Sequence, residues 1–142
     1  TSLNNLGLLL KDMGDYPAAR PYLEQALAIT REALGETHPS TATSLNNLGD
    51  LLQDMGDYPA ARDYYEQALA IDEKVYGPEH PEVATDLNNL GSLLQDMGDY
   101  PAARDYYEQA LAIFEATLPA EHPNIQVVRR NLAAVERELE GR

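Results

Sequence analysis

The sequence predicts an all-α protein, a right-handed solenoid of helical hairpins that is closed at its C-terminal end by a capping helix. Three observations carry this prediction: an internal period of 42 residues, apolar residues at helical spacing within each period, and turn-forming residues that recur at the same places. The chain has 142 residues, 44% apolar and 24% charged, with no cysteine. These values fit one globular domain over residues 1–142 with room for a hydrophobic core.

The period is visible by eye. The heptapeptide of residues 1–7 recurs at 43–49 and, with Asp86 in place of serine, at 85–91. Aligned without gaps, the first two copies share 29 of 42 residues and the last two share 31 of 42. We therefore divide the domain into repeats at residues 1–42, 43–84 and 85–126, followed by a capping helix at 127–142.

Each repeat is expected to form two helices. In the second repeat the first helix buries a stripe made of Leu45, Leu48, Leu52 and Met55. Gly56 then provides a left-handed stop, and Asp57 caps the second helix, in which Pro59 lies in the first turn. That second helix is expected to run on to Gly77, with a buried stripe of Ala61, Tyr65, Ala68, Leu69 and Ile71.

Small residues are expected where the paired helices approach each other. Gly7, Gly49 and Gly91 lie within first helices, where glycine costs about 1 kcal/mol relative to alanine. A close approach of the second helix would explain that cost. The expected small partners on the second helices are Ala19, Ala61 and Ala103, with Ala26, Ala68 and Ala110.

The two ends of the chain differ. The last helix is predicted to expose a charged face, as a terminal repeat must; its residues are Arg129, Arg130, Glu136, Arg137, Glu138 and Glu140. The N-terminal end has no such cap, so Leu8 and Leu10 are expected to lie uncovered and to allow end-to-end self-association. Because the chain begins at Thr1 without a methionine, we expect it to be part of a longer protein.

The order of large and small residues in each copy resembles the tetratricopeptide (TPR) repeat. In the second repeat the signature is Leu45, Leu48, Gly49, Leu52, Tyr58, Ala61, Tyr65 and Ala68. The usual TPR unit has 34 residues, and the longer second helix and the connector at 77–84 resemble the 42-residue repeats of kinesin light chains. The resemblance implies a protein-interaction scaffold. The connector also resembles bacterial arrays joined to signalling NTPase modules, which leaves a regulatory sensor arm as an alternative.

A ladder of asparagines is the main candidate site. Asparagine is a poor helix former, yet it recurs on every first helix, off the apolar stripe. First helices line the concave side of the superhelix that the resemblance implies, and an amide can both donate to and accept from a peptide backbone. The alternative is that these amides bond between repeats and only set the stacking. The candidate ligand-binding residues are Asn4, Asn5, Asn46, Asn47, Asn88, Asn89, Asn131, Asp50, Gln53 and Gln95.

Charge restricts the choice of partner. The formal net charge is −14, which disfavours nucleic acid and anionic membrane as partners. The families that this chain resembles bind acidic peptides with clamps of Lys or Arg. Here the expected inner positions have only three basic residues, which are Lys11, Arg130 and Arg137. We therefore expect a protein or peptide partner that is neutral or basic.

Other motifs have simpler explanations than chemistry. His38, His80 and His122 each precede a proline at a helix start, and one repeat of separation is too far for a shared metal ion. The acidic turn 54–57 lacks the ligand pattern of a calcium loop. Tyr64–Tyr65 and Tyr106–Tyr107 are expected to pack in or between repeats. No nucleophile–base pair or phosphate loop is present, so we expect no cofactor, no metal and no enzymatic activity, in a cytoplasmic protein.

Overall fold

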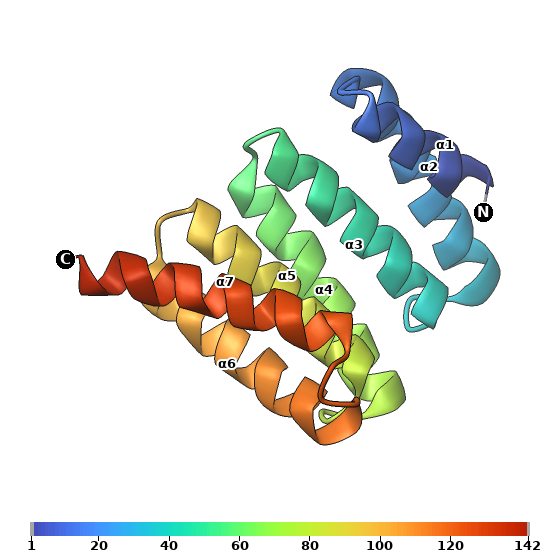
Figure 1. Cartoon of the computed structure of the whole chain (residues 1–142). Helices are drawn as coiled ribbons and strands as arrows, with labels where there is room; N and C mark the ends of the chain where they lie inside the picture. Colours follow the sequence, from blue (N-terminus) through green and yellow to red (C-terminus); the bar gives the residue numbers. More distant parts are fainter. Residues whose placement is uncertain (1, 142) are drawn as a thin grey trace. The chain divides into compact units, whose positions relative to one another are not determined.

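The computed structural model describes residues 2–141; Thr1, where the first predicted repeat begins, and Arg142, where the predicted cap ends, lie outside the described residues. The described residues form helices and turns and no strand, and the helices follow each other in antiparallel pairs (Figure 1). None of these helices has the length and apolar character that a membrane span requires. The helices are α1 (Ser2–Asp12), α2 (Tyr16–Leu34), α3 (Pro39–Asp54), α4 (Tyr58–Tyr76), α5 (Pro81–Asp96), α6 (Tyr100–Thr117) and α7 (Pro123–Glu140).

Local sequence signals set these boundaries, as expected. Helices α3, α5 and α7 begin at a proline, 42 residues apart, and a histidine caps each of them. Asp15 and Asp99 cap α2 and α6 by accepting the backbone N–H three residues ahead. The predicted left-handed stop is confirmed at Gly56, which has φ +82°, and Gly77, with φ +87°, follows the end of α4.

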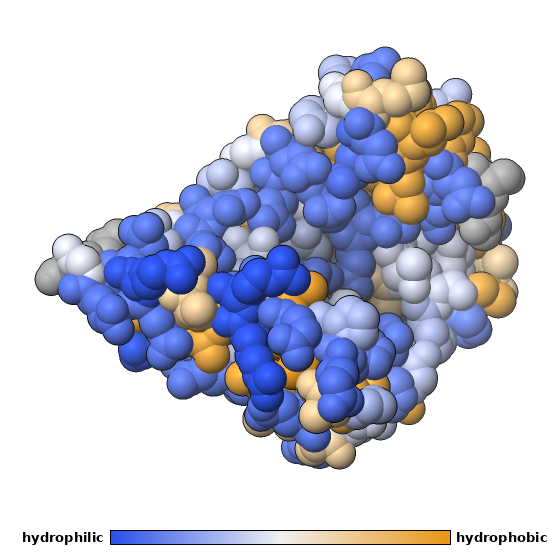
Figure 2. Space-filling model, in the orientation of Figure 1, coloured by the Kyte–Doolittle hydropathy of each residue, from blue (hydrophilic) through white to orange (hydrophobic). Residues whose placement is uncertain are grey.

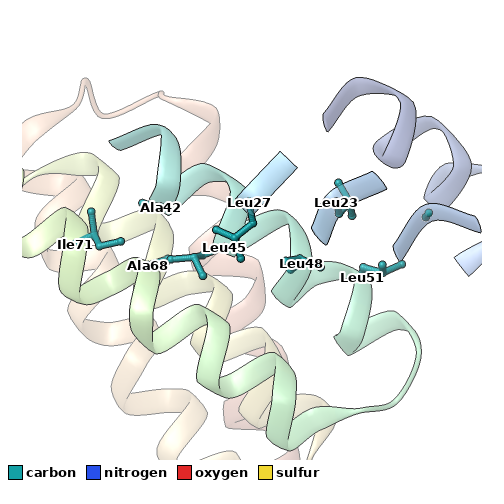
Figure 3. Packing of buried hydrophobic residues seen from close by; sticks show 9 residues of the cluster. Leu23, Leu27, Ala42, Leu45, Leu48, Leu51, Ala68 and Ile71 are labelled. Atoms are coloured by element: carbon teal, nitrogen blue, oxygen red, sulfur yellow. The ribbon is translucent and has the colours of Figure 1, made fainter. Parts of the chain in front are cut away.

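The chain divides into two compact units, residues 1–75 and Tyr76–Arg142, each of which is described by itself. In the first unit α2 packs against both α1 and α3. Its core joins α2, α3 and α4, with Leu10, Tyr16 and Tyr64 packed against it (Figure 3). The buried members of this core are Ala19, Leu23, Leu27, Ala42, Leu45, Leu48, Leu51, Ala68 and Ile71.

In the second unit α6 packs against both α5 and α7. Helix α7 buries Ile125, Val128 and Val135, and Arg129 forms an ion pair with Glu115 of α6 at 2.8 Å between Nη2 and Oε2. Hydrophilic side chains cover α7 on the face shown in Figure 2. That face agrees with the charged surface expected of a cap, while the capping role itself stays a prediction.

Two details of the buried stripes differ from expectation. Met55 is exposed, because it follows the last turn of α3 as its C-cap residue. Leu51 takes its place in the core and is fully buried. The first helix is therefore apolar on two sides, one toward its own partner helix and one toward the preceding repeat. A single 3–4 spacing describes only one of these sides.

The N-terminal end also differs. Leu10 packs against the core of the first unit and Leu8 is half-buried, so the expectation that they lie uncovered is wrong. The large exposed side chains of α1 are instead Leu6, Leu9 and Met13. Leu10 occupies the position in the first repeat that Leu52 occupies in the second. Leu52 is fully buried, and Leu10 likewise turns toward the core of the unit.

The helical glycines do mark close approaches, but the partners are large rather than small. A Cβ built on Gly49 would lie 2.7 Å from Cδ1 of Tyr65, and one on Gly91 would lie 2.7 Å from Cδ1 of Tyr107. At Gly7 the corresponding neighbour is the side chain of Leu23, also at 2.7 Å. The alanines of the second helices are buried as well, yet the glycine makes room for a large side chain of the second helix.

We expect Gly49→Ala to destabilise the protein by about 1–3 kcal/mol, because the added methyl group cannot fit beside the buried ring of Tyr65. Helix propensity alone would predict a gain of about 1 kcal/mol, so the sign of the change is the test. Urea unfolding followed by circular dichroism measures it. Gly141→Ala is the matched control: its Cβ would meet nothing closer than 3.6 Å, and its stability should stay unchanged.

Candidate protein-binding face

The predicted asparagine ladder lies on the first helices, and its members have two kinds of surroundings. Asn47 and Asn89 are half-buried and Asn5 is exposed. For these three side chains no hydrogen bond to another described residue is found.

Other members of the ladder form bonds between repeats. Asn4 of α1 donates its Nδ2 to Oγ of Ser44 in α3 at 3.4 Å, and Asn131 of α7 donates to Oδ1 of Asn88 in α5 at 3.2 Å. These two bonds match the alternative interpretation of the ladder, in which the amides set the stacking. Asn46 is half-buried and has a polar partner of its own.

The two glutamines of the candidate site hold the buried tyrosines. The hydroxyl of Tyr65 donates to Oε1 of Gln53 at 2.9 Å, and that of Tyr107 donates to Oε1 of Gln95 at 2.8 Å. Each ring is buried, while its oxygen reaches the polar surface of the first helix. From the sequence Tyr65 and Tyr107 are expected in the core and the glutamines on the surface, and the bonds between them are not predicted. One feature of the sequence does indicate this bond. The second and third repeats have tyrosine at the position of Leu23 and also glutamine at the position of Lys11.

Tyr107 has a perturbed acidity. Burial and the negative charge of Asp96 together raise the pKa of Tyr107 to about 12, while a hydrogen bond with Ser92 acts in the opposite direction. The hydroxyl therefore stays protonated at all ordinary pH values and acts only as a hydrogen-bond group.

Lys11 links the first two repeats. Its Nζ lies 2.8 Å from a carboxylate oxygen of Asp50 and 3.3 Å from one of Asp54. Partial burial alone would lower the pKa of Lys11, but the hydrogen bonds and charges of the two aspartates outweigh this effect and raise it. Asp50, a member of the candidate site, thus already has a cationic partner.

The histidines serve as helix caps. Nδ1 of His38, His80 and His122 accepts the backbone N–H two residues ahead, at 3.0, 3.0 and 3.1 Å. His80 also stacks on Tyr76, with ring centroids 4.3 Å apart. Within residues 2–141 no group of three or more His, Asp and Glu side chains is arranged to hold a metal ion.

The repeat geometry agrees with comparison to known proteins. The sequence profile of the tetratricopeptide repeat family matches residues 1–74, 51–116 and 87–142, which together span the chain. The chain therefore belongs to the tetratricopeptide repeat family, and its fold is an all-α solenoid of helical repeats. Repeats of this family are typically non-enzymatic scaffolds through which proteins interact.

Solved structures place the chain near kinesin-light-chain-like members. BtubC (BKLC) from P. vanneervenii is 28% identical with a TM-score of 0.87, over 95% of this chain and 54% of that protein. A kinesin-light-chain-like protein of Podosopora anserina with nearly identical TPR-like repeats is 30% identical with a TM-score of 0.85, over 94% and 64%. The chain thus spans less than two thirds of either structure.

A more distant structure shows the fold alone. The Sgt2 TPR domain from Aspergillus fumigatus is 22% identical, with a TM-score of 0.70 over 98% of this chain and 78% of that domain. No curated protein matches the sequence significantly.

The raised pKa of Tyr107 predicts a loss of stability in alkali. Between the ordinary tyrosine pKa of about 10 and the folded value of about 12, the unfolded chain releases a proton that the folded chain keeps. The contribution of this group is therefore complete below pH 10 and is lost as the pH rises toward 12, by about 2 kcal/mol.

Urea unfolding of the native chain and of Tyr107→Phe across this range measures the effect. Lys11, whose pKa is raised by its two aspartate partners, is present in both proteins, so the difference between them reports on Tyr107. The phenylalanine variant should lose less stability with pH. Equal losses in the two proteins would contradict the assignment.

Proposed function

We propose that this chain is a non-catalytic scaffold that binds an extended segment of a partner protein along its first helices. The observation that carries the proposal is the partial burial of Asn47 and Asn89 together with their lack of hydrogen bonds to other described residues. Both are half-buried on equivalent turns of α3 and α5, and neither amide is bonded to another described residue. A half-buried amide without a partner gains a hydrogen bond when a peptide backbone is placed beside it.

An amide suits this task better than a charged group. It supplies a donor and an acceptor together, as the peptide backbone does, so it can bond a segment regardless of that segment's side chains. The 42-residue interval repeats the same group on successive first helices. Affinity would then come from several such bonds, and specificity from the residues around them.

The surroundings of the ladder favour a neutral or basic segment. Asp54 and Asp96 lie on the same helices as the asparagines and are exposed. Repeats two and three carry most of the net charge, with formal values of −7 and −6 for residues 43–84 and 85–126. A negative surface attracts cationic segments and repels acidic ones.

Replacing both asparagines tests the site. The double variant Asn47→Ala with Asn89→Ala should bind peptides from a random library about tenfold more weakly than the native chain, because two hydrogen bonds are lost at about 0.5–1.5 kcal/mol each. Gln109→Ala is the matched control, since Gln109 is an exposed amide on the second helix α6. Binding by selected peptides that is unaffected by the double change, or affected equally by the control, would place the site elsewhere.

Charge selectivity is tested separately. A lysine-rich peptide should bind more tightly than a glutamate-rich peptide of the same length, and its affinity should fall several-fold when the salt concentration rises from about 0.05 M to 0.3 M. Fluorescence anisotropy of the labelled peptides measures both effects. Tighter binding of the acidic peptide would contradict the proposed selectivity while leaving the asparagine contacts open to the first test.

A further inference from the structure

The polar groups around Tyr107 form a chain of hydrogen bonds with a fixed direction. Burial and the charge of Asp96 raise the pKa of Tyr107 to about 12, and a hydrogen bond with Ser92 acts against this rise. A hydrogen bond lowers the pKa of a phenol when the phenol oxygen accepts it, so Ser92 is the donor. The hydroxyl proton of Tyr107 in turn goes to Oε1 of Gln95 at 2.8 Å. The donors therefore run from Ser92 to Tyr107 and from Tyr107 to Gln95.

This chain fixes which end of the Gln95 amide faces outward. An amide carries its acceptor oxygen and its two N–H donors on different atoms, so holding the oxygen also orients the donors. Gln95 is half-buried, and for its Nε2 no hydrogen bond to another described residue is found. A half-buried donor in this state gains a hydrogen bond when an external acceptor is placed beside it.

The first unit shows where a side chain at this position extends. Lys11 of α1 is the repeat equivalent of Gln95, and its Nζ reaches a carboxylate oxygen of Asp50 in α3 at 2.8 Å. Helices α5 and α7 contact each other, as α1 and α3 do. The residue of α7 that is equivalent to Asp50 is Ala134, whose side chain has no polar atom. Helix α7 therefore has no acceptor at the position where α3 provides one for Lys11.

We propose that Tyr107 is a positioning residue of the binding face, which holds Gln95 so that its Nε2 donates to a main-chain carbonyl of the bound segment. The inference rests on the proposed function, in which an extended segment follows the first helices. Gln95 comes six residues after Asn89 on α5, which places the two amides about 9 Å apart along the helix axis. About three residues of extended chain cover that distance, so one segment can reach both.

The charges near Gln95 favour a neutral acceptor over a carboxylate. Asp96 follows Gln95 directly, and α7 has Arg137 and Glu138 at the positions equivalent to Gln95 and Asp96. All three charged side chains are exposed, and two negative charges against one positive charge leave an excess of one negative charge. An anionic group gains no net attraction there. A main-chain carbonyl is the neutral acceptor that an extended segment presents at every residue.

A double-mutant cycle tests whether Tyr107 acts through Gln95. The probe is the tightest-binding peptide selected from a random library against the native chain, labelled for fluorescence anisotropy. Gln95→Ala should weaken its binding about three- to tenfold through the loss of one hydrogen bond. Tyr107→Phe keeps the buried ring and should weaken binding at least about twofold, because the amide must then be ordered when the peptide binds. In the Gln95→Ala background, Tyr107→Phe should have no further effect.

Two controls distinguish positioning from a loss of stability. Tyr106→Phe removes the hydroxyl of the adjacent residue, which is half-buried and forms no hydrogen bond with another described residue, and it should leave binding unchanged. Urea unfolding of every variant should show that it is folded under the conditions of the binding experiment. A general effect of Tyr107→Phe on the fold would weaken binding with and without Gln95, whereas a positioning effect needs Gln95.

The possible results separate this inference from the proposed function. If the double variant of Asn47 and Asn89 weakens peptide binding while Gln95→Ala or Tyr107→Phe does not, the proposed function stands and the inference is wrong. Equal effects of Tyr107→Phe in the two backgrounds would also exclude a positioning role. A peptide whose binding changes with none of these variants would overturn both proposals.

Alanine replacements in the peptide test the nature of the acceptor. Because a main-chain carbonyl is present at every residue, the effect of Gln95→Ala should persist in each singly substituted peptide that still binds. A peptide substitution that abolishes the effect of Gln95→Ala would assign the contact to a side chain of the segment and would overturn this part of the inference.

Discussion

The structure depends on one contact, the packing of the second helix of a repeat against the first helix of the next. A single hairpin has two apolar surfaces and can bury only one of them by itself. In the first unit α2 resolves this, because Leu23 and Leu27 lie in the same core as Leu48 and Leu51 of α3. Burial of two leucines at about 1.5–3 kcal/mol each is a large share of the stability of a small domain. In the first unit, the stability of the first repeat is therefore coupled to that of the second.

Several polar side chains on the first helices form hydrogen bonds that belong to the fold. Gln53 and Gln95 satisfy the hydroxyls of buried tyrosines, and Asn4 and Asn131 bond across repeats. Removal of any of these would take one hydrogen bond from a partly buried partner, at a cost on the order of 1 kcal/mol. Asn47 and Asn89, at neighbouring positions, form no hydrogen bond with another described residue. The asparagine ladder therefore contains members that bond between repeats and members that do not, and a binding experiment is best made on those whose loss leaves the fold intact.

Much of the fold could be predicted because its signals are local and repeated three times. Helix starts at Pro39, Pro81 and Pro123 and the stop at Gly56 follow from backbone chemistry that acts within a turn. The errors concern long-range packing. Met55 was placed in the core instead of Leu51, and Leu10 on the surface instead of Leu9, because periodicity gives the apolar residues of a helix but not which side faces a neighbour. The bond between Tyr65 and Gln53 depends on a rotamer across two helices, which spacing does not reveal.

Differences among nearly identical repeats show where function can vary without cost to the fold. Leucine stands at positions 6, 48 and 90 in all three copies, whereas positions 8, 50 and 92 are leucine, aspartate and serine. Positions 11, 53 and 95 are lysine, glutamine and glutamine, and Lys11 neutralises Asp50 and Asp54 of the next repeat. Lysine in place of glutamine at this position thus raises the local charge by one unit and offsets part of the negative charge of two carboxylates on the next repeat. Within each unit, the packing of α2 on α3 and of α6 on α7 is made by apolar residues and does not involve these polar positions.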